Sequence, residues 1–276
     1  MTKELKYNDK LSRKTKILNE NNMNNYAKIS FGCLKKVKCV VKSIKKSSKY
    51  SMKKFEQEIN ILNKLKETNN IITLFGYDED SEYYHIIMER GNVDLAVFRM
   101  MYEMNETHIN IILYKLLCVI NVIHNMGIIH MDLKLQNIVF TNENYYNPVL
   151  IDFGDSIISN KNIKYNNKYL IGTPNYISPE KILYTQMNHE LYKKSDLWSI
   201  GVVCYELICG NHCFDGQNNQ IIFKKIINQK WTWNFNSIDY IPTKYAIDFV
   251  SKCLTMNPNK RWNSKEALQH VWFKSI

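Results

Sequence analysis

The spacing of apolar and polar residues predicts where strands and helices lie along this chain. In the N-terminal third, the stretch KISFGCLKKVKCVVKSIKK alternates apolar and basic residues, which is typical of a half-buried β-hairpin. The stretches IITLFGY and YYHIIME predict two more strands. Between them and the hairpin, apolar residues recur at spacings of four and three with charged residues between them, which predicts an amphipathic helix. These apolar residues are Phe55, Ile59, Leu62 and Leu65.

After about residue 89 the pattern becomes mainly helical. INIILYKLLCVINVIHNMG predicts a long apolar helix that ends at Gly127. SDLWSIGVVCYELICG predicts another, with Ser195 as N-cap and Gly210 as its stop. We therefore expect an α+β fold with a polar, Asn-rich leader (1–25), a small sheet-rich lobe (26–88) and a larger helical lobe (89–276), without internal repeats.

Composition places the chain among folded proteins of the cell interior. Of its 276 residues 45% are apolar, no window offers the roughly 18 consecutive apolar residues of a membrane helix, and the N-terminus lacks the apolar region of a secretory signal. We expect no membrane association and a cytoplasmic location, with the nucleus as the alternative. The 7 cysteines form no CxxC pair and are expected to be reduced, buried thiols. A metal site at Cys209, His212 and Cys213 is the alternative.

Positive charge is concentrated at the N-terminal end. Residues 1–67 contain 18 Lys and Arg against 6 Asp and Glu, whereas the rest contains 19 against 20. Such a basic region favours nucleic acid or acidic lipid. However, only 4 of the 37 basic residues are Arg, the residue type that base-reading sites prefer. Specific nucleic-acid binding is therefore not expected, although a basic nucleic-acid binder remains an alternative.

Four short motifs occur in a fixed order: CVVK (39–42), HMDLKLQN (130–137), DFG (152–154) and SPE (178–180). Together they resemble the signature of the eukaryotic protein kinase family, from about residue 26 to the C-terminus. Lys134 and the GTPNY stretch are similar to the serine/threonine branch, and KRWNSKEALQHVWF is similar to the calmodulin-dependent group. The resemblance implies a two-lobed kinase fold.

The resemblance also implies roles for the polar residues of these motifs. Asp132 would orient or accept the proton of the attacking hydroxyl, and Lys134 would meet the γ-phosphate of ATP. Asn137 and Asp152 would supply the oxygen ligands that Mg²⁺ prefers. Lys42 would contact the α and β phosphates and pair with Glu58.

Further residues would form the nucleotide pocket or hold the fold. By the resemblance, Met88 borders the adenine site, the backbone at Glu89 and Gly91 bonds the base, and Val40 and Val139 enclose it. The phosphate-covering loop would run through Ala27, Gly32 and Leu34. Asp196 would bond the backbone of the catalytic loop, and Glu180 would pair with Arg261.

Two departures from the family pattern affect activity. The glycine-rich loop has Ala27 and Ile29 where glycines are expected, which predicts a stiffer loop and a weaker grip on nucleotide. A kinase-shaped binding module without phosphotransfer is therefore the main alternative. Met131 replaces the arginine that receives an activating phosphate, so we predict activity without phosphorylation of Ser156, Ser159, Tyr165 or Tyr169.

The function implied is that of an ATP- and Mg²⁺-dependent serine/threonine kinase acting on protein substrates. Asp94 and Glu206 match acids that favour basic residues near the target, whereas Gln136 replaces a third such acid. Both acids are equally consistent with a structural role. No regulatory segment is expected after residue 270, and the sequence leaves the oligomeric state open.

Overall fold

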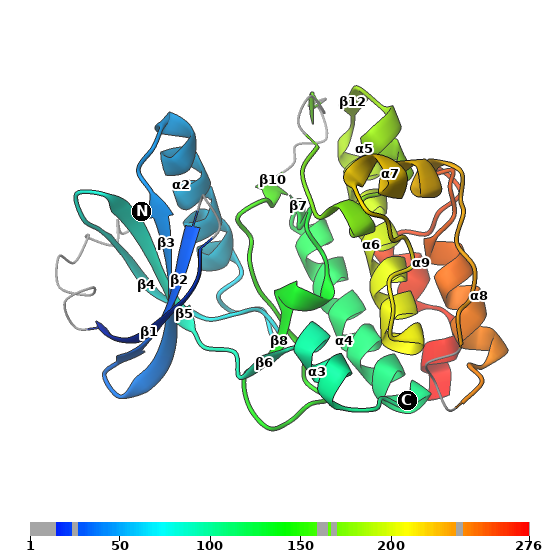
Figure 1. The fold of residues 1–276 in the computed structure, drawn as a ribbon, viewed down its shortest axis with the longest axis horizontal. Helices are drawn as coiled ribbons and strands as arrows, with labels where there is room; N and C mark the ends of the chain where they lie inside the picture. Colours follow the sequence, from blue (N-terminus) through cyan, green and yellow to red (C-terminus); the bar gives the residue numbers. More distant parts are fainter. Residues whose placement is uncertain (1–14, 24–26, 159–164, 167–169, 236–239, 276) are drawn as a thin grey trace. The chain divides into compact units, whose positions relative to one another are not determined.

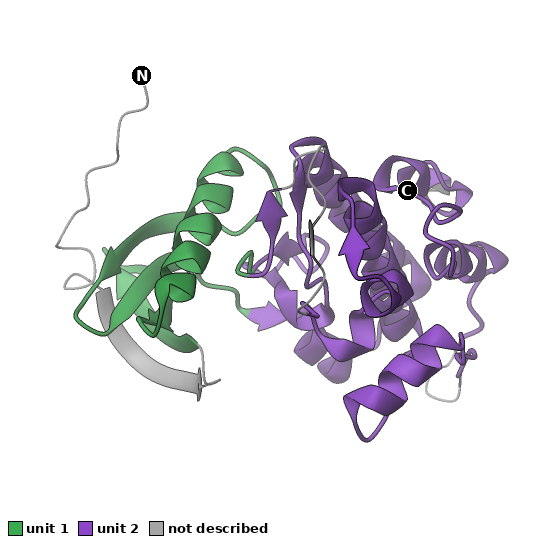
Figure 2. Cartoon of the chain, turned by 90° about the horizontal axis from the view of Figure 1, so that it is seen from above, with its two compact units in different colours: residues 1–92, 152–154 green, residues 93–151, 155–276 purple. Residues whose placement is uncertain are grey.

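The computed structural model describes residues 15–23, 27–158, 165–166, 170–235 and 240–275. The chain divides into two compact units, drawn in green and purple in Figure 2. Unit 1 comprises residues 1–92 and 152–154, and unit 2 comprises residues 93–151 and 155–276. The expected α+β division into a sheet-rich part and a helical part is confirmed, but the junction falls after residue 92 in place of residue 88. The DFG tripeptide joins unit 1, which its position in the sequence did not indicate.

Unit 1 is built on a five-stranded antiparallel sheet in the order β1-β2-β3-β5-β4. The strands are β1 (Thr15–Met23), β2 (Ala27–Leu34), β3 (Val37–Lys45), β4 (Leu74–Glu79) and β5 (Tyr83–Glu89). Strand β1 pairs with β2, so the expectation that residues 1–25 form a leader is wrong for residues 15–23. An edge strand is held by backbone hydrogen bonds, and these do not require the apolar alternation used to recognise strands.

The predicted hairpin is the β2–β3 pair. Its register runs without a shift from Ala27 opposite Ile44 to Leu34 opposite Val37. The two turn residues, Lys35 and Lys36, have φ values of 49° and 72°, the positive values that a type I′ turn requires. Because side chains alternate along a strand, Cys39 and Val41 face the core while Val40 and Lys42 lie on the other face.

Helix α2 (Lys49–Lys64) is the predicted amphipathic helix. Ser48 caps it by accepting a hydrogen bond from the N–H of Ser51, and the apolar residues that defined its pattern are buried. Its buried face also includes Glu58, which is only 1% exposed, whereas the pattern placed Glu58 at the border of that face. A carboxylate is rarely buried without a partner, so this position calls for a nearby cation.

Unit 2 contains seven described α-helices, shown in Figure 1: α3 (Leu95–Met101), α4 (Glu106–Asn125), α5 (Pro179–Leu183), α6 (His189–Cys209), α7 (Asn219–Ile227), α8 (Lys244–Cys253) and α9 (Ser264–Leu268). Helices α4 and α6 pack together, with α9 against α4 and α8 against α6. Three short 3₁₀ helices, η1 (Leu135–Asn137), η2 (Pro174–Tyr176) and η3 (Val271–Ser275), complete the helical structure described in this unit.

The predicted helix ends are partly confirmed. Gly127 follows α4 with φ of 73°, and Gly210 ends α6 in the left-handed conformation with φ of 72°. The start of α6 was predicted wrongly, because Asn188 is its N-cap and Ser195 lies inside the helix. The Ser195 hydroxyl accepts a hydrogen bond from the hydroxyl of Ser178, 17 residues earlier. Such a tertiary partner, which local sequence does not reveal, satisfies a polar residue that would otherwise favour a cap.

By length and composition, α4 is the one helix in the described part of the chain that could cross a membrane. Its apolar window is 56% buried inside unit 2, and the central helix of a globular domain meets the same criterion. The cysteines join no disulfide: all seven are free, and Cys39, Cys204, Cys209, Cys213 and Cys253 are buried.

Short strands frame the segment that carries HMDLKLQN. Strand β7 (Ile128–Ile129) precedes it and pairs with β10 (Ile157–Ile158), and β8 (Ile138–Phe140) follows it and pairs with β6 (Val93–Asp94) and β9 (Val149–Leu150). A further pair, β11 (Tyr165–Asn166) and β12 (Gln186–Met187), lies later in unit 2. The loop between β7 and β8 is therefore anchored at both ends.

Candidate active site

Three charged side chains of unit 1 meet at Lys42. Its Nζ lies 2.9 and 2.8 Å from the two carboxylate oxygens of Glu58 and 2.7 Å from Oδ1 of Asp152. Strand β3 positions the lysine, α2 positions Glu58, and Asp152 begins the DFG tripeptide. The predicted ion pair between Lys42 and Glu58 is present, and it explains how Glu58 can be buried.

The cluster around Lys42 is tightly packed. Burial alone would lower the pKa of Lys42, but the carboxylates of Glu58 and Asp152 outweigh it and raise that pKa above its ordinary value. A Cβ atom at Gly154 would lie 2.9 Å from Nζ of Lys42 and 3.2 Å from Oδ1 of Asp152. A side chain at position 154 would therefore crowd these charged groups, which gives the glycine of DFG a steric role here.

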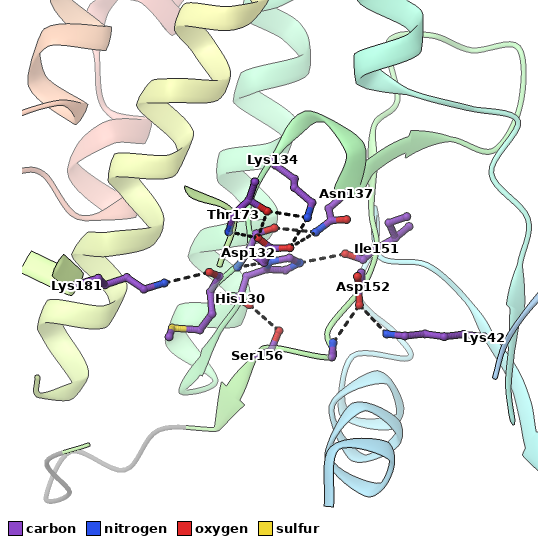
Figure 3. Close-up of polar contacts among 12 residues, drawn as sticks. Lys42, His130, Asp132, Lys134, Asn137, Ile151, Asp152, Ser156, Thr173 and Lys181 are labelled. Carbon is purple, nitrogen blue, oxygen red and sulfur yellow. Dashed lines mark hydrogen bonds and ion pairs between the residues drawn. The ribbon is translucent and has the colours of Figure 1, made fainter. Parts of the chain in front are cut away.

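A second cluster, in unit 2, is centred on Asp132 in the loop between β7 and β8 (Figure 3). Nζ of Lys134 donates to Oδ2 of Asp132 at 2.7 Å, while the backbone N–H and the hydroxyl of Thr173 donate to Oδ1 at 2.9 and 2.8 Å. Lys134 also donates to the Thr173 hydroxyl at 2.8 Å. The chain thus brings together a carboxylate, an ammonium group and a hydroxyl from segments 41 residues apart.

Asn137 is oriented by the same cluster. Its Nδ2 donates to the backbone oxygen of Asp132 at 2.8 Å and to Oδ2 at 3.1 Å. With the amide nitrogen held in this way, its carbonyl oxygen has no hydrogen-bond donor among the described residues and is left to accept one or to bind a cation.

The neighbours of Asp132 favour its ionised form. Burial raises the pKa of this carboxyl, but the Lys134 ammonium and the hydrogen bonds from Lys134 and Thr173 lower it by more than burial raises it. The pKa of Asp132 therefore lies below its ordinary value. Asp132 is therefore ionised at neutral pH, with both oxygens accepting hydrogen bonds.

The backbone before Asp132 is held by Asp196 of α6. Its two carboxylate oxygens accept the N–H groups of His130 and Met131 at 2.9 and 3.0 Å, and the ring of His124 lies 2.9 Å from one of them. These are the bonds predicted for Asp196. Met131 needs this support because its φ is 74°, an uncommon value for a residue that is not glycine.

Met131 occupies an apolar position. Its side chain is 5% exposed and packs with Ile129, Met187 and Tyr192. Its backbone oxygen accepts a hydrogen bond from Nζ of the buried Lys181 at 3.2 Å. A phosphate-receiving arginine is thus replaced by an apolar contact, and a lysine from α5 approaches the same backbone.

Of the four residues considered for activating phosphorylation, Ser156 is the one whose side chain lies among the described residues. Ser156 is fully buried and donates a hydrogen bond to the backbone oxygen of His130 at 3.0 Å, so it serves the structure as a buried donor. Ser159, Tyr169 and the side chain of Tyr165 lie outside the described residues. The prediction of activity without phosphorylation therefore stays a prediction.

The predicted phosphate-covering loop is not a loop at residues 27–34. These residues form β2, in which Gly32 lies opposite Cys39 and has no positive φ. The placement was wrong because a lone glycine was matched to a turn motif, whereas the alternating pattern around it forms a strand. The connection between β1 and β2 is at residues 24–26, outside the described residues.

Opposite residues on neighbouring antiparallel strands share a face, which sorts the residues of β2. Ala27 lies opposite Ile44, and Ile29 lies opposite Lys42, so both are on the face of Lys42. Leu34 instead packs with the core cluster of Cys39 and Val41 on the other face, and its predicted contact with nucleotide stays a prediction. Phe31, opposite Val40, is a residue of the Lys42 face that the motifs did not single out.

The predicted adenine-site residues are distributed over both units. In unit 1, Met88 lies opposite Val40 in the sheet, and Glu89 follows it at the end of β5, with its N–H donating to the backbone oxygen of Thr73 at 2.9 Å. Gly91 follows β5 in the same unit. In unit 2, Val139 is buried in β8 opposite Asp94.

The predicted structural ion pair is also present in unit 2. The guanidinium of Arg261 donates to both oxygens of Glu180 at 2.7 and 2.9 Å, and both side chains are fully buried. Sequence reasoning missed other contacts, notably those of Thr173 with Asp132 and of His212 with Glu206. No local sequence pattern predicts either contact, because in each one a loop residue meets a residue whose position depends on the tertiary fold.

Comparison with known proteins identifies the class. The family model described as "Protein kinase domain" matches residues 13–273, so the chain belongs to the protein kinase domain family. The match begins before β1, in agreement with the strand that replaces part of the expected leader.

Relatives of the same family are similar along most of the chain. Calcium-dependent protein kinase 3 of Plasmodium berghei (strain Anka) is 30% identical over 255 residues, which cover 89% of this chain and 45% of the relative. Its counterpart in Plasmodium yoelii yoelii is also 30% identical, with 46% of the relative covered. Calcium/calmodulin-dependent protein kinase type 1 of Caenorhabditis briggsae is 30% identical over 252 residues, with 67% of the relative covered. The chain thus spans less than half the length of the two Plasmodium relatives.

Proposed function

We propose that this chain is an ATP- and Mg²⁺-dependent serine/threonine protein kinase that transfers the γ-phosphate of ATP to hydroxyl groups of protein substrates. The arrangement that carries the proposal is the cluster in which Lys134, Asn137 and Thr173 all contact Asp132. A carboxylate held ionised beside an ammonium group suits a reaction in which negative charge must be positioned and neutralised.

In this proposal each side chain has a defined task. Asp132 accepts a hydrogen bond from the substrate hydroxyl and orients it. Its low pKa makes it a weak base, which is sufficient because the transition state of phosphoryl transfer is loose and demands little proton removal early on. Lys134 offsets negative charge near Asp132, and Lys42, fixed by Glu58, offers its ammonium to phosphate oxygens.

The residues present fit a hard divalent cation. The carbonyl oxygen of Asn137 is turned away from Asp132, and the carboxylate of Asp152 is 43% exposed, so both offer the oxygen atoms that Mg²⁺ prefers. When bound with ATP, the metal would neutralise charge on the phosphate oxygens. By the family resemblance, Asn137 and Asp152 would hold it.

The substrate is proposed to be a protein serine or threonine, and the location cytoplasmic. The predicted preference for basic residues near the target is not carried into this proposal, because two contacts weaken its basis. Asp94 caps α3 by accepting the N–H of Val97 at 2.9 Å. Both carboxylate oxygens of Glu206 are already paired within unit 2.

The test is turnover of labelled ATP with and without Mg²⁺, using one generic basic and one generic acidic protein as acceptors. Wild-type protein should transfer phosphate only with Mg²⁺, and Asp132→Asn should lower the rate by about a hundredfold or more while its melting temperature stays close to that of the wild type. A wild-type protein that gains thermal stability from Mg²⁺ and ATP but transfers no phosphate would instead be a kinase-shaped binding module, and the proposed activity would be wrong.

A further inference from the structure

A pocket of about 610 Å³, lined by both polar and apolar residues, lies within unit 2 beside the segment that carries Asp132. It is formed by the end of α3, the end of α6 and the loops that follow α6 and α7. Leu135 and Gln136, which directly follow Lys134 in the chain, line one side of it. The volume falls in the range of sites that bind ligands or peptide side chains.

The acids that line this pocket are already paired. Oε1 of Glu206 lies 2.7 Å from Nδ1 of His212, and Oε2 accepts the hydroxyl of Tyr176 at 2.5 Å. Burial and the Glu206 carboxylate raise the pKa of Tyr176, so its hydroxyl keeps the proton that it donates. The other acid, Asp215, lies 2.5 Å from Nζ of Lys225. Both carboxylates therefore already have a hydrogen-bonded or ion-pair partner in unit 2.

Two cations that line the pocket have no acidic partner among the described residues: Arg99 and Lys230. Nε of Arg99 donates to the backbone oxygen of Leu207 at 2.9 Å, which fixes the guanidinium against the end of α6. A Cβ atom at Gly210 would lie 3.0 Å from Nη2 of Arg99, so the glycine leaves room for this group. Capping α6 uses one N–H of Arg99, and no acceptor among the described residues takes the others.

Among the described residues that line the pocket, three cations (Arg99, Lys225 and Lys230) outnumber two acids (Glu206 and Asp215), so their balance of charge is positive. Gln136 contributes an uncharged amide. Guanidinium and ammonium groups that lack acidic partners select carboxylate or phosphoryl groups. We infer that this pocket binds an acidic segment of the protein substrate, with Arg99 and Lys230 contacting its anionic side chains. This inference rests on the proposed function, because it assigns the substrate class of the same kinase.

The inference is tested by peptide binding without ATP. Three fluorescent peptides of equal length carry Glu, Gln or Lys around an alanine that replaces the phosphate acceptor, and a fourth carries phosphoserine. Wild-type protein should bind the Glu and phosphoserine peptides roughly five- to tenfold more tightly than the Gln peptide. It should bind the Lys peptide most weakly, and the preference should fade as salt is added.

Variants connect the preference to the pocket. Arg99→Gln and Lys230→Gln should each reduce the preference for Glu over Gln by severalfold, and together they should abolish it. Lys260→Gln, which removes the same charge from an exposed position outside the pocket, should leave it unchanged. Lys230 is exposed, so its variant should fold even where Arg99→Gln weakens the end of α6.

Several outcomes would overturn the inference. They are equal binding of the Glu and Gln peptides, tightest binding of the Lys peptide, and a preference for acid that survives in the double variant. Complete displacement of the Glu peptide by millimolar inorganic phosphate would indicate a small-anion site and also contradict it. Because these peptides cannot be phosphorylated, an acid preference in a protein without phosphoryl transfer would contradict the proposed function alone and leave the pocket's ligand class standing.

Discussion

Asp132 is a carboxylate whose ionised form depends on neighbours from two parts of the chain. Lys134 is two residues away in sequence, whereas Thr173 is 41 residues away and supplies two of the hydrogen bonds to Oδ1. Since hydrogen bonds to the charged form lower a carboxyl pKa, Thr173 both positions Asp132 and tunes its acidity.

Replacing Thr173 by valine removes the hydroxyl while keeping the shape of the side chain. We expect a loss of activity of about tenfold or more, because Lys134 and Asp132 lose their common partner. The pKa of Asp132 should rise toward its ordinary value, so the acidic limb of the pH–rate profile should move to higher pH. Thr255→Val, at an exposed hydroxyl that bonds only backbone oxygens, is the matched control. An unchanged acidic limb would contradict this role for Thr173.

His212 gives a prediction of pH-dependent stability. Its hydrogen bond with Glu206 raises the pKa of His212 despite partial burial, which acts in the opposite direction. A pKa raised by folding stabilises the protein fully below the unfolded value of 6.5, and this stabilisation disappears as pH rises through the raised value. His212→Gln should therefore lower the melting temperature at about pH 6 and have little effect at about pH 9. Equal losses at both pH values would show that the contact does not depend on protonation.

At the scale of elements, α6 is buried along most of its length and carries residues that serve several neighbours. Asp196 accepts the backbone N–H of Met131, Ser199 donates to the backbone oxygen of Tyr176, and Glu206 lines the charged pocket. A helix buried on all sides shows no single apolar stripe, which is why its start was hard to locate from sequence.

The contact between α6 and α8 depends on Gly201. A Cβ atom there would lie 2.7 Å from Cβ of Cys253 and 3.0 Å from Cδ2 of Leu254, closer than side chains pack. Gly201→Ala should therefore lower the free energy of unfolding by about 1–3 kcal/mol, measured by denaturant titration. Lys252→Ala, which shortens an exposed side chain of α8, should change it by less than about 0.5 kcal/mol. Similar losses of stability in the two variants would show that the close packing of α6 against α8 does not cause the effect of Gly201→Ala.

At the scale of the whole molecule, a few buried charges join segments that are distant in the chain. Glu180 and Arg261 are 81 residues apart and fully buried, and Arg261 also donates to the backbone oxygens of Lys194 and Thr255. This pair fixes the SPE segment at the start of α5 to the segment before α9, within unit 2.

Removing one partner of this pair should destabilise unit 2 strongly. Arg261→Met leaves the Glu180 carboxylate buried without a counter-charge, so we expect a loss of about 3–5 kcal/mol in the free energy of unfolding. Lys193→Met breaks a pair with Glu190, whose carboxylate is 62% exposed, and should cost less than about 1 kcal/mol. Chemical denaturation of the two variants compares the costs directly, and equal losses would mean that Glu180 is neutralised in another way.

Much of the fold could be predicted from the sequence because the signals were local. The alternation in β2 and β3, the spacing in α2 and the glycines after α4 and α6 are each visible within one short stretch. Strand β1 was missed because its mostly polar residues do not alternate with apolar ones, so an edge strand of this kind carries no such signal. The glycine-loop placement failed because one glycine, Gly32, was given more weight than the alternation around it.

The sequence by itself determined which residues are available for the proposed phosphoryl transfer. The ordered motifs supply Lys42, Asp132, Asn137 and Asp152, and the same motifs indicate the protein kinase family. Tertiary structure alone decided which of these groups face one another. Lys42 meets Asp152 across 110 residues, and Thr173 meets Asp132 across 41. Among the residues that the structure describes, Arg99 has no acidic partner, whereas Glu206 is paired. The reason is physical: spacing along a chain fixes local conformation, whereas the partner of a charged side chain is set by the packing of elements that are far apart in sequence.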